Sequence, residues 1–303
     1  MPGLIRSLEI ARRSLLAHQG SLSVIGHNIA NVSTPGYTRR TAVLEPSAAT
    51  VENNLGFGSG VDLVQVSRQR DAFLDREVRR QKSLHGQWDV LRQQFSRLEA
   101  LVAEPSDSSL GAVLDSFFDA WMELANQPES QTLRKVVVAE GQRLTERFQH
   151  LAAGIASIRG DSDERLAGLM TSLNQDLQEI ARLNQSIQTA GLRGDQAPDL
   201  KDQRDALMER IVSVTGAAAR EDDAGMVILS LDGHQLVDGV RALSIESRRE
   251  VDDGGVIHRF YVRGREIHMN GGEAGGLEQM RDAHLPGLEG ELDRLAQALA
   301  VEV

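Results

Sequence analysis

Residues 166–187, LAGLMTSLNQDLQEIARLNQSI, carry a regular apolar pattern. Intervals of four and three residues alternate along it, as they do on the buried side of a helix in a bundle or a coiled coil. The one polar position is Asn184, which either fixes the register against a neighbouring helix or lies partly exposed near the helix end. The pattern predicts a long helix that packs against other helices. Its positions are Leu166, Met170, Leu173, Leu177, Ile180, Asn184 and Ile187.

Similar patterns extend along most of the chain. They predict further helices over 71–102, 109–126, 130–158 and 200–216. The segment RGDSDERL, residues 159–166, is expected to form a turn before the helix quoted above, because two of its acids have the spacing of a capping box. In helix 71–102 the apolar seam is predicted at Leu84, Trp88, Leu91, Phe95, Leu98 and Val102.

Strand patterns are confined to two regions. Three stretches between residues 225 and 269 alternate apolar and polar residues and are separated by turn signals, so they predict three or four antiparallel strands. The segment VDLVQV, residues 61–66, predicts one more short strand at the end of an extended connector. A last helix follows the larger region, and its apolar pattern is unbroken at Val303. We therefore expect the natural protein to continue past this residue.

These elements predict a mainly α protein with a β insertion (α+β). Its long antiparallel helices should form a bundle with coiled-coil-like seams, beside a small antiparallel β region. The predicted organisation is an amino-terminal helix and extended connector over 1–66, a long-helix bundle over 67–216, a small β-rich insertion over 217–270, and a helix over 271–303 that returns to the bundle.

Composition excludes several classes of function. The formal charge of −11 argues against nucleic acid as the main partner, because backbone binding needs a basic surface. The chain has no cysteine, which excludes thiolate catalysis and cysteine-ligated metals. Its eight histidines do not have the spacing of metal ligands, and no apolar run approaches the length of a membrane span. The sequence therefore predicts no catalytic residue, no metal and no cofactor.

The first helix has a seam that needs a partner. Eight positions, spaced four and three apart from Leu4 to Ile29, include seven apolar residues. This is either a coiled-coil seam or the buried side of an ordinary amphipathic helix. Gly20 and Gly26 each weaken an isolated helix by about 1 kcal/mol relative to Ala, so the helix should become ordered when its seam is covered.

The segment after this seam, NIANVSTPGYTRR at 28–40, is unusually rich for a helix end. Pro35 and Gly36 favour a turn, Tyr37 offers an amphipathic contact, and Arg39 with Arg40 offers charge to an acidic neighbour. The alternative is a loop that only reverses the chain.

Residues 23–40, SVIGHNIANVSTPGYTRR, resemble the amino-terminal signature of the bacterial flagellar axial proteins, the rod, hook and hook-associated group. Rod and hook proteins share this signature. The residues that carry the match are Asn28, Ala30, Asn31, Thr34, Pro35, Gly36 and Tyr37.

Later segments narrow the resemblance to the hook-associated protein 1 family, the hook–filament junction proteins. GSGVDLVQVSRQRDAFLDREVR at 58–79 is similar to the segment by which that family re-enters its long helices. LANQPESQTLRKVVVAEGQRLTERF at 124–148 is similar to its second helical hairpin, and DLKDQRDALMERIVSVTGA at 199–217 to its Asp-Gln-Arg-Asp helix. The last similar segment is GGEAGGLEQMRDAHLPGLEGELDRLAQALA at 271–300, which resembles the Gly-Gly-Leu and Arg-Asp segment of that family.

The resemblance implies a structural subunit, not an enzyme, that joins hook to filament outside the cell. It implies export unfolded through the flagellar type III apparatus with an export chaperone, and no cleaved signal peptide. The implied partners are copies of the same chain, the hook protein and the second hook-associated junction protein, with no nucleic acid and no membrane insertion. Members of the group cover the amino-terminal helix with carboxy-terminal helices, and no such helix precedes Val303.

The resemblance and the seam together predict an assembly interface in the first 40 residues. The alternatives are another axial protein, a rod or hook subunit, or a helical scaffold for a ligand-binding or enzymatic pocket near His258 or Asp222. The predicted interface residues are Leu4, Leu8, Ala11, Leu15, Leu22, Ile25, Asn28, Ile29, Asn31, Pro35, Gly36, Tyr37 and Arg39.

Overall fold

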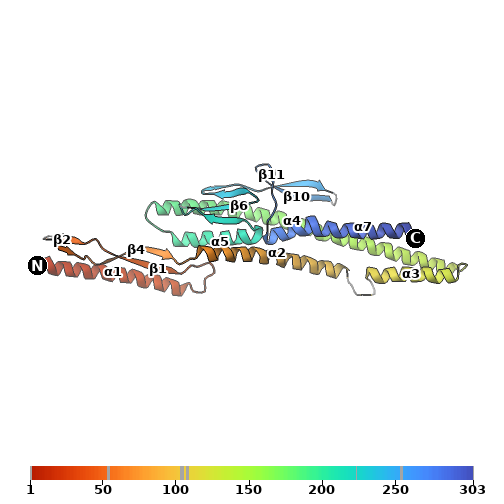
Figure 1. The fold of residues 1–303 in the computed structure, drawn as a ribbon, viewed down its shortest axis with the longest axis horizontal. Coiled ribbons are helices and arrows are strands. Elements are labelled where there is room, and N and C mark those ends of the chain that lie inside the picture. The colour runs from red at the N-terminus through yellow and green to blue at the C-terminus, as the bar shows by residue number, and fades with distance from the viewer. Residues whose placement is uncertain are drawn as a thin grey trace.

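The computed structural model is an elongated molecule built mainly from long helices (Figure 1). It describes residues 2–52, 55–102, 106, 109–222, 224–252 and 255–302. The predicted fold class, mainly α with a β insertion, is confirmed. The helices are α1 Pro2–Ala30, α2 Ala72–Val102, α3 Leu110–Asn126, α4 Gln131–Gly191, α5 Pro198–Thr215, α6 Gly272–Gln279, the π-helix η1 Met280–His284, and α7 Leu285–Glu302.

One long helix replaces two predicted ones, so the turn predicted at residues 159–166 is wrong. α4 runs through this segment without a break. Asp163, expected in a turn, is buried and accepts a hydrogen bond from the backbone N–H of His258 on the β insertion at 2.9 Å. Asp161, proposed as a cap, forms an exposed ion pair with Arg97 of α2. Contacts with other elements therefore override the local capping signal.

The β insertion contains more strands than the sequence indicates. The prediction of three or four strands is wrong, because one strand forms before the predicted stretches, at 218–221, and two-residue strands form within them. One sheet has the order β5-β6-β7-β8 and another β11-β10-β9, and all pairs are antiparallel. The strands are β5 Ala218–Glu221, β6 Val227–Leu231, β7 His234–Asp238, β8 Arg241–Ala242, β9 Glu246–Asp252, β10 Gly255–Val262 and β11 Arg265–Glu266.

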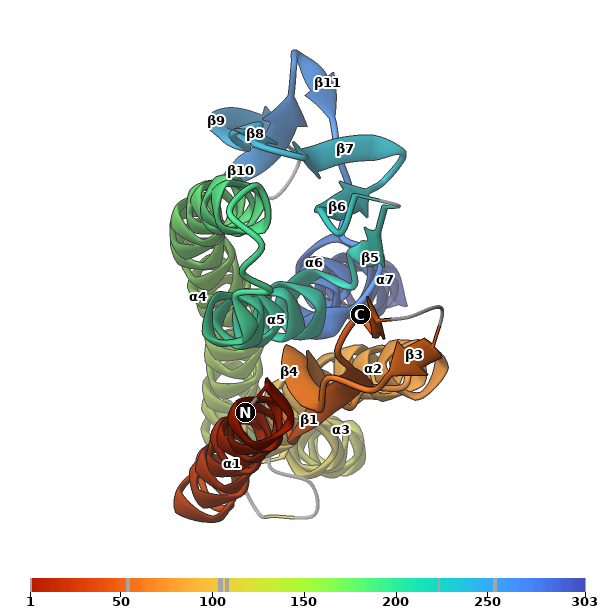
Figure 2. The same cartoon turned by 90° about the vertical axis from the view of Figure 1, so that its left-hand side faces the viewer.

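The insertion covers one side of α4 and α5, and α1 lies toward the other side (Figure 2). The main core forms between the β insertion and the helices α4 and α5, where the buried seam of α4 meets the apolar side of β6 and β7. Leu177 and Ile180 of the quoted stretch are fully buried here. This burial explains why residues 166–187 are apolar at such regular intervals.

Asn184 contacts a neighbouring helix, as the first of its two predicted roles requires, and it also contacts a sheet. The residue is fully buried, and its side-chain amide donates to the backbone oxygens of Val227 at 3.1 Å and Gly239 at 2.6 Å. Its oxygen accepts from the Val227 N–H and from Arg204 of α5 at 2.9 Å. Asn184 therefore holds α4 both against the sheet and against the neighbouring helix α5.

The seam predicted on α2 is only half buried. Leu91 and Leu98 are in a core cluster with α4 and η1. Trp88 is 67% exposed, and Leu84 is also exposed.

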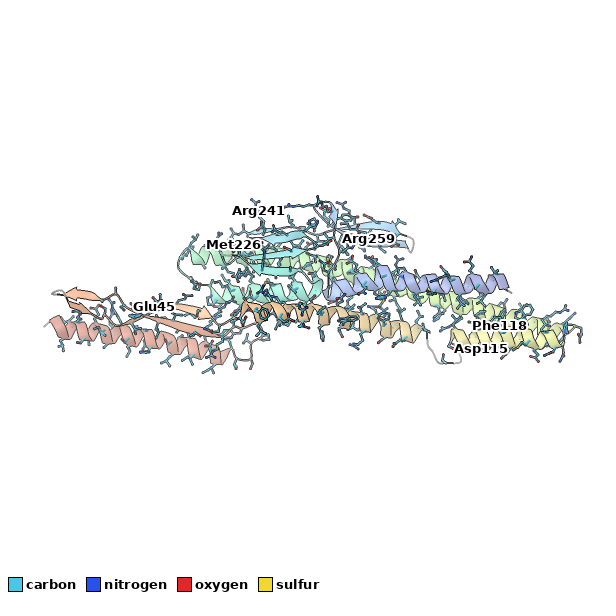
Figure 3. The ribbon with its side chains drawn as sticks, in the orientation of Figure 1. Glu45, Asp115, Phe118, Met226, Arg241 and Arg259 are labelled. Atoms are coloured by element: carbon cyan, nitrogen blue, oxygen red, sulfur yellow. The ribbon has the colours of Figure 1, made fainter. Side chains whose placement is uncertain are left out.

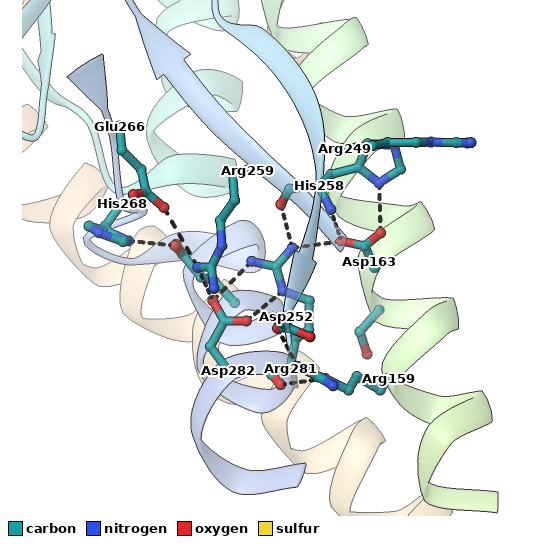
Figure 4. Close-up of polar contacts among 12 residues, drawn as sticks. Arg159, Asp163, Arg249, Asp252, His258, Arg259, Glu266, His268, Arg281 and Asp282 are labelled. Atoms are coloured by element: carbon teal, nitrogen blue, oxygen red, sulfur yellow. Dashed lines mark hydrogen bonds and ion pairs between the residues drawn. The ribbon is translucent and has the colours of Figure 1, made fainter. Parts of the chain in front are cut away.

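A polar cluster attaches the β insertion to the helices (Figure 4). Arg281 of η1 is fully buried and donates to Asp163 Oδ1 at 2.6 Å and to the backbone oxygen of His258 at 2.8 Å. His258 Nδ1 lies 2.6 Å from Asp163 Oδ2. Burial alone would raise the pKa of Asp163, but the hydrogen bonds from His258 and Arg281 outweigh it and lower that pKa.

A second histidine should make stability depend weakly on pH. A hydrogen bond with Glu278 (2.9 Å) raises the pKa of His268. The resulting stabilisation is present below the unfolded pKa of about 6.5 and is lost as pH rises through the folded value. We expect His268→Gln to flatten the change in urea midpoint between pH 6 and 8, by a small amount because the imidazole is largely exposed. If the urea midpoint changed equally with pH in the His268→Gln variant and the unchanged protein, the result would contradict this prediction.

Candidate assembly surface

The predicted seam of α1 lies on the molecular surface. Its six large apolar residues, from Leu4 to Ile29, are between 52% and 76% exposed, and Ala11 is exposed as well. They follow one side of the helix over about seven turns at intervals of four and three. Val32, just past the helix, is also exposed. A continuous apolar stripe of this kind is typical of a surface that another chain covers.

The opposite side of α1 is occupied within the chain. A hairpin of β1 Arg40–Pro46 and β4 Val61–Arg68 packs on it, and β2 Thr50–Glu52 pairs with β3 Leu55–Phe57 at the far end of the hairpin. Ala17 of α1 is 3% exposed there, and a side chain at Gly20 would collide with Leu63 of β4. The hairpin thus holds α1 by its small residues and leaves the seam uncovered.

The segment 28–40 folds around Asn28. The Asn28 side chain donates to the backbone oxygen of Arg40 at 2.8 Å, and its oxygen accepts from the Arg40 N–H and the Tyr37 hydroxyl, both at 2.9 Å. Asn31 is half-buried and accepts from Thr34 at 3.2 Å. Gly36 has φ of +79°, a conformation that favours glycine. Asn28 and Tyr37 therefore set the path of the chain from α1 into β1.

Arg40 finds its acidic neighbours in its own chain. It is buried, and its guanidinium donates to Asp199 at 2.5 Å and Asp202 at 3.1 Å, both on α5. Its cation lies 5.0 Å from the centre of the Tyr37 ring. Burial lowers its pKa, but the hydrogen bonds to the two aspartates outweigh it and the pKa is raised. Arg39, by contrast, is exposed.

A network of arginines and aspartates, which we call the joint, connects the α1–hairpin unit to the helical body. Arg68 at the end of β4 donates to Asp202 at 2.9 Å and to Asp205 at 2.7 Å. Arg70 donates to Asp75 of α2 at 2.7 Å and also to Asp205. The joint consists of Arg40, Arg68, Arg70, Asp75, Asp199, Asp202 and Asp205.

Sequence reasoning did not single out the aspartates of the joint. A signal was present, since Asp199, Asp202 and Asp205 are spaced three apart and thus lie on one side of a helix. Their partners are more than 130 residues away in sequence, and no local pattern identifies them.

Four of the predicted interface residues line a groove beside the joint. Pro35, Gly36, Tyr37 and Arg39 form one wall, and the first turn of α2 and the middle of α5 form the other. The groove has a volume of 650 Å³. Pro35, Gly36 and Arg39 are exposed, and Tyr37 is half-buried. The structure thus gathers these four residues at one place, next to the end of the α1 seam.

The residues named for an alternative ligand pocket are engaged within the chain. His258 contacts Asp163, as described above, and Asp222 Oδ1 accepts from the backbone N–H groups of Ala224 and Met226. In the described ranges, no three His, Asp or Glu side chains are placed to bind a metal ion. No helix among the described residues is long and apolar enough to cross a membrane.

The amino-terminal part of the chain is similar to one protein family, and most of the rest is similar to another. Residues 8–38, which contain most of the seam and the segment folded around Asn28, match the family of flagella basal body rod proteins. Most of the seam therefore lies in a segment similar to that of flagellar axial proteins. Residues 95–303 match the helical domain of flagellar hook-associated protein FlgK. The chain belongs to the flagellar hook-associated protein 1 family.

Individual relatives agree with this assignment. The chain is 30% identical to flagellar hook-associated protein 1 of Bacillus subtilis over 81% of its own length and 48% of the relative. It is 27% identical to the Salmonella typhimurium protein of the same name over 96% of its length and 54% of the relative. The chain thus spans about half the length of these relatives.

A solved structure shares the fold. The structure of the flagellar hook junction protein FlgK from Burkholderia pseudomallei matches with a TM-score of 0.55 at 19% identity. The match covers 67% of this chain and 38% of the other. A rod or hook subunit that shares only the first 40 residues does not account for the match over 95–303.

Proposed function

We propose that this chain is a structural subunit of the bacterial flagellum that joins hook to filament, and that it is not an enzyme. The observation that carries the proposal is the continuous, exposed apolar seam of α1 on the side that the hairpin leaves free. Membership of the hook-associated protein 1 family supports it. In this proposal the protein is located outside the cell, in the flagellum.

In this proposal, the apolar side chains of the seam stabilise the assembly because neighbouring chains bury them. A leucine that passes from an exposed to a buried position contributes about 1.5–3 kcal/mol, and the stripe has six large apolar side chains to bury. Gly20 and Gly26 keep α1 weak as an isolated helix, so export as an unfolded chain through a type III apparatus meets little resistance. Folding and assembly then occur together when neighbours cover the seam.

The partners in this proposal follow the predicted organisation. Residues 1–66 assemble in the inner layer, the bundle over 67–216 and the helix over 271–303 form the next layer, and the β insertion over 217–270 faces outwards. Copies of the chain, the hook protein and the second hook-associated junction protein cover the assembly interface. An export chaperone and the export apparatus handle the chain before assembly, with no nucleic acid partner and no membrane insertion.

The experiment replaces a seam residue by an acid in the complete gene product. Leu15→Glu or Leu22→Glu should leave the helical body folded, because both side chains are exposed in the single chain, and should abolish incorporation into flagella. Motility and the protein content of isolated flagella report incorporation. Ser23→Glu, at an exposed position of α1 outside the seam, is the matched control and should assemble normally. Normal incorporation of both leucine variants would refute the role of the seam.

A further inference from the structure

The helical body has a basic groove for which the proposed function gives no use. Two adjoining hollows of 290 and 340 Å³ lie between the first half of α2 and the edge strand β5, and they share Arg76, Arg79 and Ala219 in their walls. Arg68 and Arg70 of the joint lie at one end, and Arg220 of β5 contributes from the other wall. The three acids in these walls form ion pairs with arginines: Asp75 with Arg70, Asp205 with Arg68 and Glu221 with Arg204. This concentration of arginines contrasts with a chain whose formal charge is −11.

Three of these arginines form no ion pair with a residue in the described ranges of the chain. Arg76 contacts the backbone oxygen of Ala72, and the hydrogen-bond partner of half-buried Arg79 is the sulfur of Met208 at 3.5 Å. Arg220 is exposed and forms no ion pair with a described residue. Burial lowers the pKa of Arg79 and outweighs the nearby charge of Asp75, which raises it. An added carboxylate in the groove would be stabilised by Arg76, Arg79 and Arg220, none of which forms an ion pair with a described residue.

A matching acidic surface lies on α3. Asp115, Asp119 and Glu123 follow one another at intervals of four on its exposed side, and none forms an ion pair with a described residue. Like charges at this spacing destabilise a helix by a few tenths of a kcal/mol per pair, and nothing in the described chain offsets that. Phe118 and Met122 lie beside the acids and are 44% and 60% exposed.

The apolar residues of the two surfaces also correspond. Leu84 lines the groove, and Trp88, one turn further along α2, is 67% exposed. An interface with apolar anchors and flanking charges has the usual composition of a protein–protein contact. The buried side of α3 packs on α4 through Phe117 and Val113, so its acidic side is free.

We propose that the acidic side of α3 in one copy of this chain docks in the arginine groove of a second copy. This inference rests on the proposed role as a self-assembling subunit. The two surfaces lie at different positions along the body: α3 and the labelled Asp115 and Phe118 are at the end opposite α1, whereas the groove is near the start of α2 (Figures 1 and 3). The contact is therefore head-to-tail, which generates a row or a closed ring of copies and not a two-fold dimer.

Disulfide cross-linking tests the pairing, since the chain has no cysteine of its own. Purified Arg76→Cys and Asp119→Cys chains are mixed and mildly oxidised. We expect cross-linked pairs at about tenfold or higher yield than from Asp119→Cys mixed with Arg241→Cys, because Arg241 is exposed on β8 away from the groove. A yield equal to that of the control mixture would overturn the proposal.

Charge exchange separates specific docking from random collision. Arg220→Glu in the first chain, or Asp115→Arg in the second, should each reduce the cross-linking yield by about tenfold. Both changes together should restore it, and failure to restore it would overturn the pairing. Both positions are exposed, so neither change threatens the fold. The test uses purified chains, and its outcome is therefore independent of whether the Leu15 and Leu22 variants enter flagella.

Discussion

Replacing Arg281 by Met should lower the free energy of unfolding of the helical body by about 3–5 kcal/mol. The guanidinium is fully buried, and it bonds Asp163 of α4, the backbone of β10 and the neighbouring Asp282. Methionine fills much of the same volume but leaves the Asp163 carboxylate, itself 5% exposed, without its cation. An uncompensated buried charge is among the most destabilising single changes known in proteins.

Urea unfolding followed by circular dichroism measures this loss. Arg294→Met is the matched control, because Arg294 is exposed and pairs with Glu291 within one turn of the same helix. Its expected effect is about 0.5 kcal/mol or less. Equal midpoints for the two variants would show that the cluster around Asp163 contributes little to stability.

Asp163 also shows why one prediction from the sequence was wrong. Residues 159–166 contain good local signals for a helix start, and an isolated peptide would have no reason to ignore them. In the folded chain, the carboxylate of Asp163 is used by Arg281 and His258, which are about a hundred residues away or more in the sequence. Long-range ion pairs of this kind leave no periodic trace, so the sequence alone predicts two helices where there is one.

Apolar periodicity was a better guide. The seams of α1 and α4 are continuous, because a helix that buries one side must repeat apolar residues every three or four positions. Periodicity identifies a side but not what covers it. Asn184 faces a sheet, Trp88 faces outwards, and the seam of α1 is open, although all three belong to similar patterns.

The sequence predicted one part of the candidate assembly surface, residues 28–40, but not the joint. Residues 28–40 were singled out by composition and resemblance, and the structure shows Asn28 and Tyr37 hydrogen-bonded to each other. The arginine–aspartate joint was missed because its two halves are brought together only by the fold. The assembly role of the interface residues stays a prediction.

Removing Asp202 should loosen the joint without unfolding the helical body. Its carboxylate accepts from Arg40 at 3.1 Å and from Arg68 at 2.9 Å, and all three residues are largely buried. Asp202→Ala removes one of the two carboxylates bound by Arg40 and one of the two bound by Arg68, and breaking two buried ion pairs at once should cost about 3 kcal/mol. The hairpin contacts the body mainly through β4 and α5, so this loss falls on the attachment of the α1–hairpin unit.

A distance measurement across the joint detects the loosening. Fluorophores attached through Glu45→Cys on β1 and Arg241→Cys on β8 report the separation of the two parts, since both residues are exposed and lie on opposite sides of the joint (Figure 3). A loss of 3 kcal/mol shifts the equilibrium between docked and undocked units by roughly a hundredfold. The distance distribution should broaden markedly, while the far-ultraviolet circular dichroism of the body stays unchanged.

The control for this change is Asp89→Ala, which removes an exposed carboxylate that pairs with Arg92 on the same helix and should leave the distribution narrow. A narrow distribution in the Asp202 variant would contradict the role of the joint, as would melting of the body.

The orientation of α1 that the joint fixes also has a consequence for assembly. In the proposed assembly, the joint sets the direction in which the seam of α1 meets the next subunit, so a loosened unit must lose conformational freedom before it binds. Asp202→Ala should therefore reduce incorporation into flagella even though every residue of the seam is intact.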